Sequence, residues 1–340
     1  MSRRKKTSRP TAADVAREAG ISQSAVSRAF TPGASVAQST RHRVLEAARK
    51  LKYRPNALAR SLTTQRSRII AVAMTQLDNP FYPSVLQSLS RLLQARGYQI
   101  LLFTAPQGEA ADPLFESVMR YQVDGIILAS TMLSSALARE CRGAGVPVVL
   151  FNRTTNDTGM SSVAGDNEAG GAAIAAFLHA GGHRRYAFMA GLEDSSTSRD
   201  RERGFRTALK ELGVAEISRA VGRYTREDAA EATRALLHQE QRPDAIFCAN
   251  DHMAIACMEV ARMEFGLNIP RDLSIVGFDD AGMASAPTFD ITTYSQPFAA
   301  MAAATVSMLS DLMDAPDQPP RRCIVGGELI VRSSARRPPQ

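Results

Sequence analysis

The sequence predicts a small all-α head that contains a helix-turn-helix, followed by a larger α/β domain built as two lobes. Three observations carry this prediction. Two short helical patterns meet at Gly20, apolar runs of strand length alternate with helices from about residue 67 onward, and that alternation occurs twice. Near-continuous apolar strands separated by amphipathic helices are typical of parallel sheets that helices cover on both faces.

Size and charge agree with a divided chain. At 340 residues it is longer than one typical domain. Residues 1–68 hold 16 Lys and Arg against 3 Asp and Glu, a balance of +13, whereas the remainder holds 25 against 31, a balance of −6. A basic head on a mildly acidic body indicates a polyanion partner at one end of the chain only.

The cysteines and the N-terminal segment exclude several classes of protein. The four cysteines are far apart in sequence and form no CxxC, so we expect buried reduced thiols rather than a metal site, and no cofactor. No apolar run follows the basic first residues, and no stretch of about 18 apolar residues could span a bilayer. These features predict a cytoplasmic protein without a membrane partner.

The first two helices are expected between Thr11 and Phe30. Thr11 followed by Asp14 is typical of a helix N-cap with an acidic partner, Gly20 is a helix stop, and Ser22 is a second cap. Small and apolar residues at helical spacing form the two inner faces: Val15, Ala16, Ala19, Ala25, Val26 and Ala29. Two short helices joined by a glycine turn form a helix-turn-helix, although an ordinary αα-hairpin fits these residues equally well.

The outer face of the second helix and the next helix complete the head. Polar side chains that can reach base edges in a major groove lie on that outer face: Gln23, Ser24, Ser27 and Arg28. A third helix is expected from about Ala37 to Leu51, and its apolar face consists of Val44, Leu45, Ala48 and Leu51. Residues 1–10 are expected to be a basic flexible arm that adds phosphate contacts or is simply solvated.

A linker follows the head. Asn56, directly after Pro55, is placed to cap one short helix of small and apolar residues. A helix this short is not stable alone in water. We therefore expect a hinge, residues 55–66, that becomes ordered only when something packs against it.

Several motifs in this order resemble the head and hinge of the lactose/galactose-repressor (LacI/GalR) family of bacterial transcription regulators. They are DVAREAGIS, AVSR, the Thr40–Arg41 opening of the third helix, and YRPNALARSL, and the likeness continues over nearly the whole chain. The resemblance implies a DNA-binding domain over 11–54 and an effector-binding, dimerisation domain over 67–340. One departure is Ala37, where the family commonly has a capping Ser or Thr; the cap is weaker here or displaced to Ser35.

The resemblance also implies which residues contact DNA. Hinge helices of a dimer would place Leu62 as an apolar wedge in the minor groove and open it to Ala57, Leu58 and Arg60; the alternative for Leu62 is packing beneath a linker. Gln23, Ser24, Ala25 and Arg28 are expected in the major groove. Phosphate contacts are expected from Thr11, Ser22, Ser27 and Asn56. The implied partner is a pseudo-palindromic operator bound by a homodimer. A dimer is favoured over a tetramer, because the tail after Val331 lacks the leucine heptads of a tetramerising coiled coil.

The larger domain is expected to hold two sets of strands. The first set covers 69–74, 98–104, 124–129 and 146–151, and the second covers 186–190, 245–249 and 273–278. A helix at 298–313 and strands within 324–331 are expected to cross back between the lobes. Lobe 1 would then span about 67–166 and 297–323, and lobe 2 about 167–296 and 324–334. This arrangement resembles the type I periplasmic-binding-protein fold.

Ligands of open α/β sheets bind beyond the carboxyl ends of the strands, and polar or aromatic residues follow most strands here. The resemblance makes Arg199, Asn250 and Asp279 the polar anchors of an effector. Supplementary contacts and aromatic walls are expected from Asp78, Asn152, Gln296, Phe81 and Tyr224. Because an Arg fork opposed by carboxylates and carboxamides suits hydroxyl groups or a carboxylate, we expect a sugar or sugar acid. The alternative for each single residue is a loop cap or an inter-lobe salt bridge.

The sequence therefore predicts a ligand-responsive, sequence-specific DNA-binding regulator, in the first instance a repressor. A sugar-binding receptor of a transporter would have the same two lobes but would need a secretion signal and no DNA-binding head. A sugar-modifying enzyme on this scaffold is disfavoured, because the chain has no GxSxG elbow, P-loop or HExxH motif. We accordingly expect no catalytic residue and no metal site.

Overall fold

Two compact units make up the chain, residues 1–67 and 68–340. The structure is a computed structural model that describes residues 10–31, 33–54, 66–74, 77–104, 118–129, 140–141, 143–155 and 159–339. The basic arm and nearly all of the hinge lie outside these residues. The roles expected for Asn56, Ala57, Leu58, Arg60 and Leu62 therefore stay predictions.

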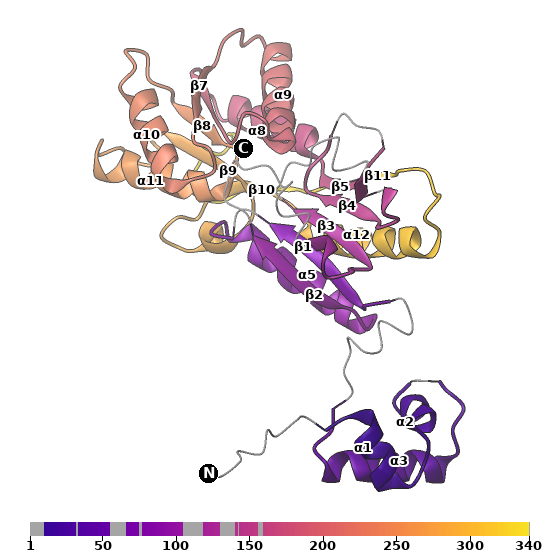
Figure 1. Cartoon of the computed structure of the whole chain (residues 1–340). Coiled ribbons are helices and arrows are strands. Elements are labelled where there is room, and N and C mark those ends of the chain that lie inside the picture. The colour runs from indigo at the N-terminus through magenta and orange to yellow at the C-terminus, as the bar shows by residue number, and fades with distance from the viewer. Residues whose placement is uncertain are drawn as a thin grey trace, which may run out of the picture. The chain divides into compact units, whose positions relative to one another are not determined.

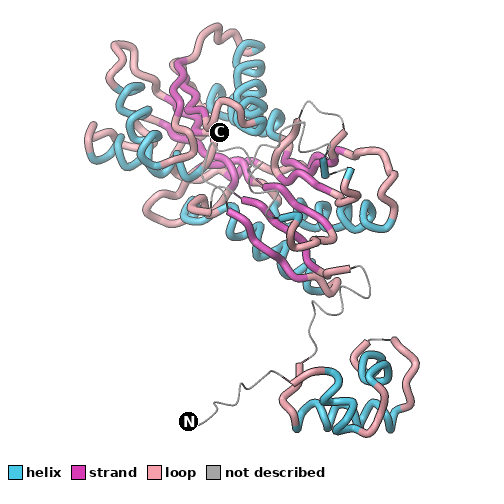
Figure 2. The backbone as a smooth tube through the Cα atoms, viewed as in Figure 1, coloured by secondary structure: helices cyan, strands magenta, loops and turns pink. Residues whose placement is uncertain are grey.

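The first unit is a three-helix head composed of α1 (Ala12–Ala19), α2 (Gln23–Ala29) and α3 (Gln38–Lys50). Thr11 and Asp14 form a reciprocal capping box at the start of α1, and Gly20 ends that helix in a left-handed conformation with φ 61°. The three helices pack together in one small bundle (Figures 1 and 2). Val15, Val26 and Val44 are completely or almost completely buried in its core. The helix-turn-helix prediction is confirmed.

The third helix differs in two details from its prediction. Ala37 is the N-cap, and no side chain bonds the free N–H groups of the first turn, so the cap is not displaced to Ser35. Leu45 is 38% exposed, and Ala47 is buried in its place. Helix geometry explains the second difference, because 47 and 48 lie three and four residues after Val44 and share its face, whereas 45 points away.

The second unit contains two sheets of six strands. The first consists of β1 (Ile69–Met74), β2 (Gln99–Thr104), β3 (Gly125–Ala129), β4 (Val148–Phe151), β5 (Ser161–Gly165) and β11 (Arg322–Val325). Its order is β11-β5-β4-β3-β1-β2 and every pair is parallel. Helices α5 (Phe81–Ala95) and α12 (Phe298–Asp314) cover one face (Figure 1). These elements form lobe 1.

The second sheet and its helices form lobe 2. The strands are β6 (Tyr186–Ala190), β7 (Ser218–Val221), β8 (Ala245–Cys248), β9 (Ser274–Asp279), β10 (Thr292–Ser295) and β12 (Leu329–Ile330). Their order is β12-β10-β9-β8-β6-β7, and only β12 runs antiparallel to its neighbour. The helices are α8 (Asn167–Ala180), α9 (Ser196–Glu211), α10 (Arg226–Leu237) and α11 (Asp251–Met263).

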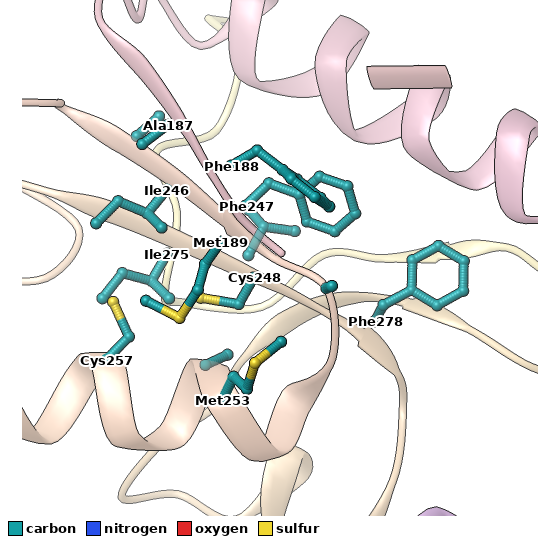
Figure 3. Packing of buried hydrophobic residues seen from close by; sticks show 14 of the residues in the cluster. Ala187, Phe188, Met189, Ile246, Phe247, Cys248, Met253, Cys257, Ile275 and Phe278 are labelled. Carbon is teal, nitrogen blue, oxygen red and sulfur yellow. The ribbon is translucent and has the colours of Figure 1, made fainter. Parts of the chain in front are cut away.

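The core of lobe 2 explains why the sequences of its central strands β6 and β8 are continuous apolar runs. Phe188 and Phe247 point to one face of the sheet, while Met189 and Cys248, their neighbours in sequence, point to the other (Figure 3). On that second face Met253 and Cys257 rise from α11 towards the strands (Figure 3). Since helices cover both faces, the central strands β6 and β8 are buried at every position and are made of apolar and aromatic residues. The predicted two-lobed α/β fold is confirmed.

The chain passes between the lobes at three points, close to residues 166, 296–297 and 326–328. The helix expected to cross, α12, instead packs entirely on lobe 1 beside α5. Strand β11 continues in the first sheet to Val325, so the last crossing falls two residues later than the expected boundary. The crossings are hydrogen-bonded side by side, from Asp166 N to Val325 O at 3.0 Å and from Ser295 N to Glu328 O at 2.8 Å.

Candidate functional site

The head presents a polar face suited to a DNA groove. Side chains at both N-caps and along the outer side of α2 are exposed: Thr11, Ser22, Gln23, Ser24, Ser27 and Arg28. Ala25 is half-buried. The Ser22 hydroxyl oxygen caps α2 by accepting from Ala25 N at 3.3 Å. All DNA-contact residues predicted within the head are thus on one helix or at a helix start, where phosphates and base edges are commonly bound.

Two arginines of α3 are used inside the head. Arg41 donates to Ala29 O at 2.9 Å and to Ala34 O at 3.3 Å, which ties the end of α2 and the following loop to α3. Arg43 donates to the carbonyl oxygens of Ala19 and Gly20 at the end of α1. These guanidinium groups satisfy carbonyls that a helix end leaves without partners. Part of the basic charge of the head therefore stabilises the fold.

In the second unit, polar side chains from both lobes meet at the carboxyl ends of the strands. We call this group the inter-lobe cluster. Most of its members are at least nine-tenths buried, which is costly unless their polar atoms are paired. Its members are Asn79, Tyr82, Asn152, Arg153, Asn167, Ser195, Thr197, Arg201, Tyr224, Asn250, Asp279 and Gln296.

Arg201 of α9 is the most connected cation of this cluster and is only 2% exposed. Its Nε donates to Asn167 Oδ1 at 2.8 Å, Nη1 donates to the carbonyl oxygen of Ala249, and Nη2 lies 3.3 Å from Asp279 Oδ1. The guanidinium also stacks over the Phe278 ring, with its Cζ 3.7 Å from the ring centroid. These partners use three of its five N–H groups and hold the fork in one orientation.

Asp279 links the two lobes. It ends β9 with a left-handed φ of 112° and accepts a hydrogen bond from Gln296 Nε2 at 2.7 Å. Burial raises the pKa of its carboxyl group, while Arg201, Gln296 and a side-chain hydrogen bond from Asn79 of lobe 1 act in the opposite direction. The neighbouring Asp251 accepts from Ala281 N at 2.9 Å and from Thr293 Oγ1 at 2.7 Å, and so fixes the loop that carries Asp279.

Three buried amide atoms of the cluster have no hydrogen-bond partner within the described residues: Asn152 Oδ1, Asn250 Nδ2 and Gln296 Oε1. The other polar atom of this side chain, Asn250 Oδ1, caps α11 by accepting from Met253 N at 3.0 Å. An unpartnered buried polar group costs about 1–3 kcal/mol. Two acceptors and one donor, which come from lobe 1, lobe 2 and a crossing segment, are therefore left for a polar ligand to satisfy.

Tyr224 and Tyr82 form an aromatic side of the cluster. The Tyr224 hydroxyl lies 3.3 Å from both Ser195 Oγ and Thr197 Oγ1. Its ring occupies the space left open by Gly191, where a Cβ would lie 2.1 Å from the ring. Burial raises the pKa of Tyr82, and a side-chain hydrogen bond joins that tyrosine to Asn152.

Three of the predicted effector contacts lie outside the inter-lobe cluster. Arg199 is exposed on α9, away from the cluster, and the buried arginine is Arg201. Phe81 is 1% exposed and packs in the core of lobe 1 against Phe151 and Phe298, so it supports the cluster from beneath. Asp78 is exposed, and its charge acts on His252 of lobe 2 rather than on the buried group.

The other predicted contacts, Asn152, Tyr224, Asn250, Asp279 and Gln296, do come together in the cluster. Sequence reasoning missed Arg201, Arg153 and the hydroxyls at the start of α9. The sequence did contain a signal for Arg201. Arg201, Phe205 and Leu209 are spaced four residues apart, so they share one face of the helix, and that face is buried.

Among the residues that the structure describes, no group of three His, Cys, Asp or Glu side chains could hold a metal ion. No described helix combines the length and the apolar character needed to cross a membrane.

Two family descriptions match the chain. The one for bacterial regulatory proteins of the lacI family matches residues 11–56, and the one for a periplasmic binding protein-like domain matches residues 175–335. The HTH-type transcriptional regulator CelR of Thermobifida fusca is 32% identical over 335 residues, which cover 96% of this chain and 98% of CelR.

Solved structures agree with these matches. A complex of the transcriptional regulator CelR with cellobiose is 30% identical, with a TM-score of 0.73 over 96% of this chain and 100% of the other. The lac repressor dimer bound to operator and the anti-inducer ONPF is 25% identical, with a TM-score of 0.86 over 96% of this chain and 99% of the other. The chain therefore belongs to the lacI family of bacterial regulatory proteins, as a DNA-binding transcription regulator with a ligand-binding domain and not an enzyme.

Proposed function

We propose that the protein is a repressor whose operator affinity is changed by a sugar or sugar acid bound in the inter-lobe cluster. The observation that carries this proposal is the set of three unpartnered buried atoms, Asn152 Oδ1, Asn250 Nδ2 and Gln296 Oε1. Two of them accept and one donates. A hydroxyl group both donates and accepts, so a ligand with several hydroxyls matches all three.

The charges of the cluster add a preference. The Arg201 fork is oriented by Asn167, Ala249 and Asp279, and Asp279 is also bonded by Gln296. A carboxylate on the ligand would gain charge-assisted hydrogen bonds from it. The CelR relative was solved with cellobiose, which supports a carbohydrate in this fold.

On the DNA side we propose a homodimer that binds a pseudo-palindromic operator in the cytoplasm. The related lac repressor was solved as a dimer on its operator. A two-fold dimer presents two copies of α2 to two half-sites. Ligand binding would change operator affinity by favouring one arrangement of the lobes over another, and the coupling free energy is the difference in ligand affinity between these states.

A thermal-shift screen tests the ligand class. The full chain is incubated with neutral sugars, sugar acids and nucleobases, and a bound ligand raises the melting temperature by mass action. We expect stabilisation by a member of the sugar or sugar-acid sets. If only nucleobases stabilise the protein, the proposed ligand class is wrong.

A matched pair of variants tests the site. Asn250→Ser keeps a side chain that caps α11 but removes the unpartnered Nδ2. It should abolish or strongly reduce the thermal shift without lowering the melting temperature of the free protein by more than a few degrees. Arg199→Ala, on the exposed side of α9, should leave the shift unchanged. An undiminished shift in Asn250→Ser would place the ligand elsewhere.

A further inference from the structure

Arg153 reaches from lobe 1 into lobe 2. It lies two residues beyond the end of β4 and is 4% exposed. Its Nη1 donates to Ser195 Oγ and, at 3.0 Å, to Thr197 Oγ1, both at the start of α9. The adjacent Thr154 N–H donates to Ser196 Oγ at 2.9 Å. Two consecutive residues of lobe 1 thus hold three consecutive residues of lobe 2.

Two opposing effects act on this contact. Hydrogen bonds from a charged donor are stronger than those between neutral groups. The N-terminus of a helix, however, carries partial positive charge that disfavours a cation, and the first turn of α9 has no acidic residue to offset it. Ser195 is also shared, because its Oγ caps α9 by accepting from Ser198 N at 3.4 Å. The contact is therefore specific in geometry but can be broken at modest cost.

The same hydroxyls belong to the inter-lobe cluster. Ser195 Oγ and Thr197 Oγ1 lie 2.9 Å apart and 3.3 Å from the Tyr224 hydroxyl. Arg153 also acts electrostatically on Tyr82 of lobe 1. The two hydroxyls that accept from Arg153, those of Ser195 and Thr197, thus also contact the Tyr224 hydroxyl on the aromatic side of the cluster.

We propose that Arg153 is a latch that keeps the two lobes closed before any effector binds, and that it is a positioning residue for effector binding. An effector then meets a cleft that is already assembled, and its apparent affinity is not reduced by the population of an open form. The second half of this inference rests on the proposed effector site. The first half concerns the ligand-free protein alone.

Hydrogen exchange of the full, ligand-free chain tests the latch. We compare the wild type with Arg153→Ala and Thr197→Val, and follow amides in residues 150–155 and 192–200. Each variant should raise exchange there about tenfold or more, as expected for loss of a charge-assisted hydrogen bond. Exchange in α10 and α11 should stay unchanged. The double variant should exchange no faster than Arg153→Ala, because both changes remove the same contact.

Controls separate a latch from a general role in folding. Arg199→Ala removes an exposed guanidinium from the same helix and should change no segment. Exchange that rises throughout lobe 2 in both Arg153→Ala and the milder Thr197→Val would show a role in folding and overturn the latch. Unchanged exchange in residues 150–155 and 192–200 would overturn it as well.

Ligand binding then separates the latch from the proposed function. For a sugar or sugar acid found by the thermal-shift screen, Arg153→Ala should bind about tenfold more weakly, and Arg153→Lys, which keeps one donor but not the fork, should lie between. If no compound in the screen binds, the exchange result still decides the latch. If a compound binds the wild type and Arg153→Ala equally, Arg153 has no positioning role, although the assigned ligand stands.

Discussion

The ion pair of Arg201 with Asp279 is maintained only by what surrounds it. Taking both charges out of water costs more than their attraction returns unless further hydrogen bonds satisfy each group. Asn167 and the Ala249 carbonyl do so for the guanidinium, and Gln296 does so for the carboxylate. Each partner of the pair is therefore needed by the other.

Removal of the cation should consequently be severe. Arg201→Ala leaves Asp279 buried without its main counter-charge, and we expect the free energy of unfolding to fall by about 3–5 kcal/mol. The thermal shift with effector should disappear, whereas DNA binding by the folded fraction should persist. Chemical denaturation and DNA titration measure these effects. Arg199→Ala is the matched control and should change stability by no more than about 0.5 kcal/mol; a similar loss in both variants would contradict the assignment.

Asp251 gives a pH dependence of defined sign. Burial and the charge of Asp279 raise its pKa well above the usual 3.8, so the folded chain binds this proton more tightly than the unfolded chain. Stability from this group is therefore complete below the unfolded pKa and is lost as pH rises through the folded value, by up to about 1.4 kcal/mol per pH unit.

Asp251→Asn removes this titration while keeping the shape of the side chain. The free energy of unfolding of the wild type minus that of the variant should fall as pH rises above about 3.8 and then level off. Urea denaturation of both proteins across this range measures the difference. A difference that is constant, or that grows with pH, would contradict a raised pKa.

The different burial of Arg199 and Arg201 shows what residue types alone leave open. Residues 199 and 201 are two positions apart on α9, which is a rotation of about 200° around a helix. One faces solvent and the other faces the cluster. The sequence showed an arginine-rich segment after a strand, but which arginine is buried depends on where the helix begins, and Ser195 sets that start by capping it.

Among the three helices of the head, α3 has the least favourable start. Its N-cap Ala37 has no side-chain acceptor, whereas Thr11 and Ser22 cap α1 and α2. Ala37→Ser should therefore stabilise the head by about 0.5–2 kcal/mol. Hydrogen exchange of the full chain should show slower exchange in the first turn of α3. Ser35→Ala is the control, because Ser35 is exposed and is not the cap, and slowing in both variants would contradict the capping argument.

The predictability of the strands depended on their composition. The apolar runs at 69–74 and 186–190 were found to the residue, because nearly every side chain in them is apolar, as suits strands buried on both faces. Three strands were not predicted: β5 (SSVAG), β7 (SRAV) and β10 (TTYS). Their small or polar residues carry little apolar signal, and their strand character comes from pairing with neighbours that the sequence does not specify.

At the scale of the whole molecule, binding to DNA should depend strongly on salt. Each phosphate neutralised by the basic head lowers log K by about 0.9 per tenfold rise in salt.

Leu62→Ala should weaken binding to a selected operator more than binding to random duplex, because a wedge acts only where the base step can be kinked. Fluorescence anisotropy with both DNAs over a range of salt measures this. Equal losses on the two DNAs would contradict the wedge, and an unchanged salt slope would confirm that Leu62 neutralises no phosphate.

The three chain crossings bear on the mechanics of the second unit. Since two hydrogen bonds join them, at Asp166–Val325 and Ser295–Glu328, they supply a common axis for rotation of one lobe against the other. This axis lies at the carboxyl edge of the first sheet, and β1 begins at the opposite edge, about 20 Å away for six residues. A rotation of a few degrees about the axis would therefore displace Ile69, at the start of the second unit, by an ångström or more.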